Sequence, residues 1–77
     1  MKKSIYSDRY RALCGALIAA RKAAGITQQQ LADRLKKPQS FVAKYENGER
    51  RLDVAEFMTI AEELGVDPAK ILAKNKR

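Results

Sequence analysis

Residues 27–48, TQQQLADRLKKPQSFVAKYENG, decide the fold of this chain. Thr27 precedes a short amphipathic run and Gln30 follows three residues later, which is the spacing of a capping box at a helix start. Pro38 suits the first position of another short helix, because it needs no backbone donor there, and Asn47-Gly48 is a helix stop signal. The stretch therefore predicts two helices, over residues 28–35 and 38–46.

A second start signal occurs three times along the chain. It consists of an apolar residue, a capping residue and another apolar residue five positions after the first, the spacing of the hydrophobic staple. The three sets are Ile26-Thr27 with Leu31, Leu52-Asp53 with Phe57, and Val66-Asp67 with Ile71. Glu56 stands three residues after Asp53, so this pair also predicts a capping box. Spacings of three and four recur and no segment alternates with period two, so we expect an all-α fold. The five predicted helices cover residues 8–24, 28–35, 38–46, 54–64 and 68–73.

Length and composition predict one small globular domain. The 77 residues are 45% hydrophobic and 32% charged, which suits one core. We expect a single domain over residues 1–77, with a basic N-terminal arm at 1–6 and a basic tail at 74–77. One cysteine, Cys14, and no histidine exclude an internal disulfide, the usual zinc ligand sets and His-based catalytic dyads. We therefore expect no enzyme, no metal and no cofactor, and interpret Cys14 as a small buried hydrophobe.

The charge distribution favours a polyanionic partner. The formal net charge is +7 and the sequence pI is about 9.9. Residues 1–26 carry six basic and one acidic group, residues 27–51 six and three, and residues 52–77 four and five. The positive field thus belongs to the first two thirds of the chain, which favours nucleic acid before a membrane surface. Because no stretch approaches the apolar length of a membrane span or a signal peptide, we expect a cytoplasmic protein without membrane contact.

Two helices of about two turns, separated by only Lys36-Lys37, must cross steeply, which indicates a helix-turn-helix. The opening T-Q-x-x-L-A at Thr27, the E-N-G that ends at Gly48 and an arginine at position 21 stand at mutually consistent distances. From about Leu17 to Leu72 the chain resembles the Cro/phage-repressor type (xenobiotic-response-element family) of helix-turn-helix domain. The resemblance implies a repressor-like fold that binds double-stranded DNA. Lys36 departs from the family's common glycine, and strains the turn if positive φ is needed there.

Helical geometry separates two sides of the segment 38–46. At about 100° per residue, Pro38, Val42 and Tyr45 share the side that we expect to face the core, with Phe41 at its edge. The opposite side is expected to read base edges in the major groove, where glutamine can pair with adenine and lysine can reach guanine. The predicted base-reading residues are Gln39, Ser40, Ala43 and Lys44.

Residues around this segment are expected to contact phosphates or to support the fold. The predicted phosphate contacts are Gln28, Lys36, Lys37, Asn47, Arg50 and Arg51. The resemblance further implies that Gln28 braces Gln39, and that Arg21 and Glu46 form a structural ion pair between the first helix and the recognition helix.

We expect a sequence-specific transcriptional repressor that binds an inverted repeat as a homodimer. The expected interface lies around residues 68–73 and the end of 54–64, where Ile60, Ile71 and Leu72 offer apolar surface. The alternative is a protein-interaction adaptor or antitoxin-like partner-binding module with the same fold. The polar, basic segment 38–46 favours DNA, because a protein-binding groove exposes aromatic anchors.

Overall fold

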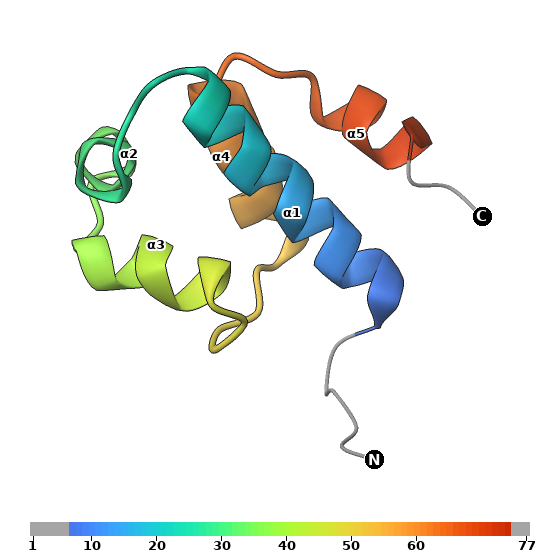
Figure 1. Cartoon of the computed structure of the whole chain (residues 1–77), viewed down its shortest axis with the longest axis horizontal. Coiled ribbons are helices and arrows are strands. Elements are labelled where there is room, and N and C mark those ends of the chain that lie inside the picture. Colours follow the sequence, from blue (N-terminus) through green and yellow to red (C-terminus); the bar gives the residue numbers. More distant parts are fainter. Residues whose placement is uncertain (1–6, 75–77) are drawn as a thin grey trace.

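The computed structural model describes residues 7–74, which contain five helices and no strand. The helices are α1 (Asp8–Ala23), α2 (Gln28–Leu35), α3 (Gln39–Glu46), α4 (Val54–Glu63) and α5 (Pro68–Lys74). In Figure 1, α2 and α3 lie on one side of α1 and α5 lies on the other side. The prediction of an all-α, five-helix fold is confirmed.

Side-chain caps hold the starts of α1, α2 and α4. The Ser7 side chain accepts a hydrogen bond from the Tyr10 backbone N–H at 3.0 Å. α2 and α4 each begin with a reciprocal capping box, formed by Thr27 with Gln30 and by Asp53 with Glu56. These bonds satisfy backbone donors that have no partner inside the helix. The two capping boxes therefore fix the starts of α2 and α4 where the sequence predicts them.

Several predicted helix ends need correction. Pro38 is the N-cap of α3, with extended backbone at φ −69° and ψ 155°, and it is exposed rather than turned toward the core. α1 and α4 each end one residue earlier than predicted, because Ala24 and Leu64 are their C-caps. α5 continues to Lys74, so a tail starts at residue 75 at the earliest. The predicted arm at 1–6 and the rest of the tail lie outside the described residues.

The core joins all five helices. Its largest fully buried side chains are Leu17, Leu31, Val42, Tyr45 and Ile60. Val42 and Tyr45 anchor one side of α3 in this core, which leaves the opposite side of the helix facing outward.

Cys14 is buried in the same core, as predicted. Burial raises the pKa of its thiol, against a smaller opposing effect of a hydrogen bond with Tyr10. The thiol is therefore kept protonated and unreactive, as expected of a packing residue.

Candidate nucleic-acid interface

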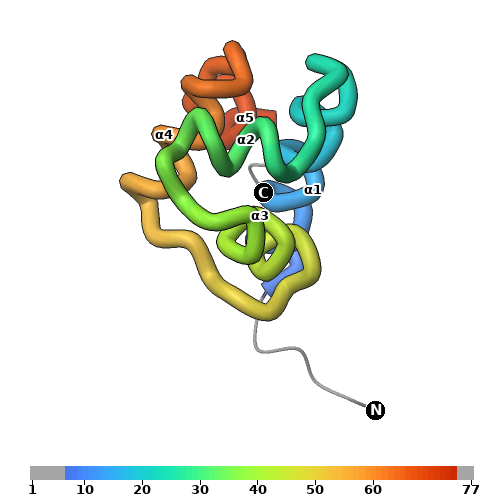
Figure 2. Tube along the Cα trace, turned by 90° about the vertical axis from the view of Figure 1, so that its left-hand side faces the viewer, coloured from blue at the N-terminus to red at the C-terminus, as the bar shows by residue number. Residues whose placement is uncertain are grey.

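α2 and α3 form the helix-turn-helix. The most extensive contact between helices in the described residues joins these two, and Figure 2 shows them together at the face turned toward the viewer. The turn begins at Lys36, which adopts the left-handed conformation at φ 58° and ψ 43°. The Lys37 N–H then bonds the Ala32 carbonyl at 3.0 Å, closing the end of α2. The turn therefore does need positive φ at Lys36, the condition under which the sequence predicts strain at this residue.

The outward side of α3 carries the predicted base-reading residues. Gln39, Ser40 and Lys44 are exposed, and Ala43 is half-buried. Phe41 lies within the core and contacts the Tyr45 ring edge-on, with ring centroids 5.9 Å apart. The polar side chains therefore point away from the core on one face, as the helical spacing predicts.

A chain of side-chain hydrogen bonds runs from the core to the start of α3. Arg21 donates to both oxygens of Glu46, at 2.8 and 3.0 Å, in a pair whose side chains are only 11% and 6% exposed. Gln28 donates to the same carboxylate at 2.9 Å, and Gln39 donates to the Gln28 carbonyl oxygen at 2.7 Å. The Arg21–Glu46 pair and the bracing of Gln39 by Gln28 are thus present, and we call these four residues the relay.

The relay fixes the orientation of the Gln39 amide. A carboxylate can only accept hydrogen bonds, so Gln28 presents its NH₂ group to Glu46 and turns its carbonyl oxygen toward Gln39. Gln39 must then donate one N–H to Gln28. Its second N–H and its Oε1 remain for another molecule. One donor beside one acceptor complements the major-groove edge of adenine, where N7 accepts and the N6 amino group donates.

Basic side chains border this face. Lys36 and Lys37 follow α2 and are exposed, and the Lys37 Nζ lies 5.3 Å from the centre of the Phe41 ring. Arg51 stacks on the Tyr10 ring at 4.8 Å. Asn47 is exposed at the C-cap of α3, where Gly48 follows with φ 79°. The structure thus places the predicted phosphate contacts on both sides of α3.

Arg50 is held by contacts within the chain, although its side chain is 39% exposed. Its guanidinium donates to both oxygens of Glu56, at 3.0 and 2.9 Å, and to the Arg51 carbonyl at 3.0 Å. The same group lies 4.7 Å from the centre of the Phe41 ring. The hydrogen bonds from Arg50 and from the Asp53 backbone hold the pKa of Glu56 below its usual range.

Sequence reasoning missed two residues that hold the α3–α4 loop, residues 47–53. The Leu52 N–H donates to the Tyr10 hydroxyl at 2.7 Å, across 42 positions of sequence. Glu56, predicted only as a capping residue, also binds Arg50. No local pattern signals the first contact. The second was accessible, because an acidic residue six positions after an arginine can reach back across a short turn.

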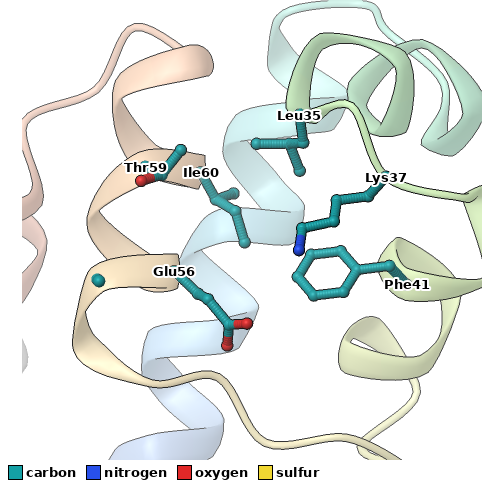
Figure 3. Close-up of a pocket in the computed structure, with 7 residues that line it drawn as sticks. Leu35, Lys37, Phe41, Glu56, Thr59 and Ile60 are labelled. Atoms are coloured by element: carbon teal, nitrogen blue, oxygen red, sulfur yellow. The ribbon is translucent and has the colours of Figure 1, made fainter.

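A small hollow lies beside α3. It has a volume of about 170 Å³. Figure 3 shows the Lys37 side chain lying over the Phe41 ring at one edge of the hollow. The Glu56 carboxylate lies at the opposite edge of the hollow. Its lining residues are Leu35, Lys37, Phe41, Ala55, Glu56, Thr59 and Ile60. Most of the lining belongs to side chains that already stabilise the fold.

Within residues 7–74, His, Cys, Asp and Glu side chains form no group of three or more that could hold a metal ion. None of the helices in that range is long and apolar enough to cross a membrane.

Comparison with known proteins agrees with this geometry. Residues 17–71 match a helix-turn-helix family model. The chain belongs to the Cro/repressor-type helix-turn-helix family. An XRE-family like protein from Pseudomonas syringae pv. tomato is 58% identical, with a TM-score of 0.84 over 87% of this chain and 82% of that one. The clp gene regulator ClgR from C. glutamicum shares the fold, with a TM-score of 0.77 at 22% identity over 95% and 94% of the two chains. A search of the curated proteins gave no match.

Membership of the Cro/repressor-type family makes this chain a DNA-binding transcriptional regulator with double-stranded DNA as its partner. The match covers the whole helix-turn-helix together with α4 and most of α5.

Proposed function

We propose that this regulator is a sequence-specific repressor that binds an inverted repeat as a homodimer. One observation carries the proposal: the exposed Gln39 amide is held in a fixed orientation at the start of α3 by the relay. A fixed donor and acceptor pair reads a base edge at lower entropic cost than a freely rotating side chain.

Residues around Gln39 complete the proposed interface with DNA, some by reading bases and others by contacting phosphates. The exposed Ser40 and Lys44, with Ala43 between them, extend the base-reading face along α3. Lys36, Lys37, Asn47 and Arg51 flank it and meet the sugar-phosphate backbones. The N-terminus of α2 adds backbone N–H groups beside Gln28, which suit a phosphate oxygen.

Dimerisation requires a correction to the expected interface. Ile60 and Ile71 are buried, at 1% and 9% exposure, so they belong to the core and cannot supply the apolar contact with a second chain. Leu72 on α5 is 50% exposed and remains available. We place the interface around α5 with Leu72 as its apolar contact. The proposed dimer requires two recognition helices in successive major grooves, about 34 Å apart.

The test of base reading compares two variants on two duplexes. Gln39→Ala should weaken binding to an operator selected from random duplexes by about 1–3 kcal/mol, and should barely change binding to a scrambled duplex. Arg51→Ala should weaken both, and should reduce the dependence of log K on log salt concentration by about one. Equal losses on both duplexes for Gln39→Ala would mean that α3 does not read bases through this residue.

Assembly is tested by sedimentation of the free protein and of its operator complex. Two chains per operator are expected, and Leu72→Glu should reduce that stoichiometry, because a charge cannot be buried unpaired in an apolar contact. Val54→Glu is the matched control, since Val54 is 75% exposed on α4. A single chain per operator at micromolar concentration would contradict the homodimer, and disruption by Val54→Glu alone would move the interface to α4.

A further inference from the structure

The α3–α4 loop carries Asn47, Arg50 and Arg51, yet it contains no regular secondary structure of its own. The Glu49 and Arg50 N–H groups bond the Lys44 carbonyl at 2.8 and 3.2 Å, which finishes the end of α3. Beyond that point, the Leu52 and Asp53 N–H groups donate to side chains from α1 and α4.

The first of these side chains is Tyr10 of α1. Its hydroxyl accepts the Leu52 N–H at 2.7 Å, and its ring lies 4.8 Å from the Arg51 guanidinium. One residue thus fixes both the backbone of the loop and the direction of an arginine on its outer side.

The second is Glu56 of α4. Its Oε1 accepts from the Asp53 N–H and from Arg50, each at 3.0 Å, and its Oε2 accepts from Arg50 at 2.9 Å. The same guanidinium lies 4.7 Å from the centre of the Phe41 ring, so two kinds of contact hold this one end of the Arg50 side chain. Arg50 therefore ties the loop to α4; its side chain is still 39% exposed, and its phosphate contact stays a prediction.

We propose that Tyr10 and the Arg50–Glu56 pair are positioning residues that hold the α3–α4 loop in its DNA-binding conformation before DNA arrives. The inference rests on the proposed function, in which this loop meets the phosphate backbone. A loop ordered in advance loses less conformational entropy on binding. Removing either tether makes the loop disordered in the free protein, while the phosphate contacts themselves can still form.

Two pairs of matched variants test this. Tyr10→Phe removes the hydroxyl that accepts from Leu52 and also bonds the Cys14 thiol, and Tyr45→Phe removes a buried hydroxyl that has no hydrogen-bond partner among the described residues. Glu56→Gln and Glu49→Gln each remove one negative charge next to the same loop, but the exposed Glu49 is not part of a tether. Glutamine at position 56 can still complete the capping box, but as a neutral acceptor it loses the ion pair with Arg50 and holds the Asp53 N–H less strongly.

Affinity is measured on a random-sequence duplex, because phosphate contacts do not depend on sequence. Tyr10→Phe and Glu56→Gln should each bind about threefold to tenfold more weakly than the wild type. Tyr45→Phe should bind as the wild type does, and Glu49→Gln slightly more tightly, since less negative charge faces the DNA. The salt dependence of Tyr10→Phe should equal that of the wild type, because no phosphate contact is removed.

Hydrogen exchange of the free protein distinguishes local loosening of the α3–α4 loop from a general loss of stability. At temperatures where each variant is fully folded, the Leu52 and Asp53 amides should exchange faster in Tyr10→Phe and Glu56→Gln, while core amides of α1 and α4 stay protected. Tyr10→Phe with wild-type affinity would overturn the proposal. So would tighter binding by Glu56→Gln, which would make Glu56 only a repulsive charge. Failure of the wild type to bind any duplex would overturn the proposed function and this inference together.

Discussion

Glu46 shows how one side chain serves both stability and recognition. It is 6% exposed, and it accepts hydrogen bonds from Arg21 and from Gln28. Arg21 also donates to the Ile26 carbonyl at 2.9 Å, so the guanidinium ties the end of α1 to the start of α2 as well as to α3. Three helices therefore depend on a single carboxylate.

Glu46→Ala should lower the free energy of unfolding by about 3–5 kcal/mol, because it leaves the largely buried Arg21 without its counter-charge. Thermal melting of the folded chain measures the effect. Glu49→Ala is the control, since it removes an exposed carboxylate three positions away and should change stability by less than about 0.5 kcal/mol. A wild-type melting temperature for Glu46→Ala would show that the pair contributes nothing in solution.

At the scale of elements, the turn between α2 and α3 contains a strained residue. Lys36 has φ 58° and is the one non-glycine residue with positive φ within residues 7–74. A side chain with a Cβ atom costs about 1–2 kcal/mol in this conformation. The position is exposed, so the side chain gains no packing that offsets this cost.

Lys36→Gly should therefore stabilise the chain by about 0.5–1 kcal/mol, the relief of strain being partly offset by the greater entropy of glycine in the unfolded state. Denaturant unfolding measures the change, and Lys37→Gly, next along the turn, is the control that should not stabilise. If Lys36 contacts a phosphate, the same variant should bind DNA more weakly with a reduced salt dependence. A loss of stability on Lys36→Gly would refute the assignment of strain.

Helix starts could be predicted from the sequence because each depends on residues within five positions of one another. Thr27 with Gln30 and Asp53 with Glu56 form the predicted bonds for this reason. Pro38 was misplaced by one position, because its fixed φ suits an N-cap as well as a first helical residue. Local patterns cannot resolve that choice, which depends on where α2 ends.

The candidate site, too, could be predicted only where it depends on residues close together in the sequence or on the family resemblance. The outward residues of α3 follow from helical spacing, and the relay followed from the family resemblance. The Tyr10–Leu52 bond joins residues 42 positions apart, so only the packed fold brings them together. Ile60 and Ile71 were misassigned to a dimer interface because an apolar residue looks the same in sequence whether it covers the core or a partner.

For the whole molecule, the pH dependence of stability follows from groups whose pKa differs between the folded and unfolded states. The pKa of Glu56 is lowered by folding, so its contribution is present above the unfolded pKa and is lost as pH falls through the folded one. The pKa of Tyr45 is raised by burial and by the nearby Glu46, so its contribution is present below the unfolded value of 10.0 and declines above it.

We therefore expect a plateau of stability around neutral pH with a decline on each side. Denaturant midpoints measured across the pH range should show a shallower acid decline for Glu56→Gln and a shallower alkaline decline for Tyr45→Phe. Each variant should leave the opposite side of the profile unchanged, which makes each the control of the other. Unaltered profiles would mean that these two groups titrate alike in the folded and unfolded chain.

The relay also constrains how such a regulator can acquire a new operator during evolution. Since Glu46 dictates which end of the Gln28 amide faces outward, a residue at position 39 that offers only an acceptor would meet another acceptor. An acidic residue at position 39 should therefore require a compensating substitution at position 28, whereas a residue that can donate should not. Ser40 stands outside the relay, so specificity can change there without a second substitution.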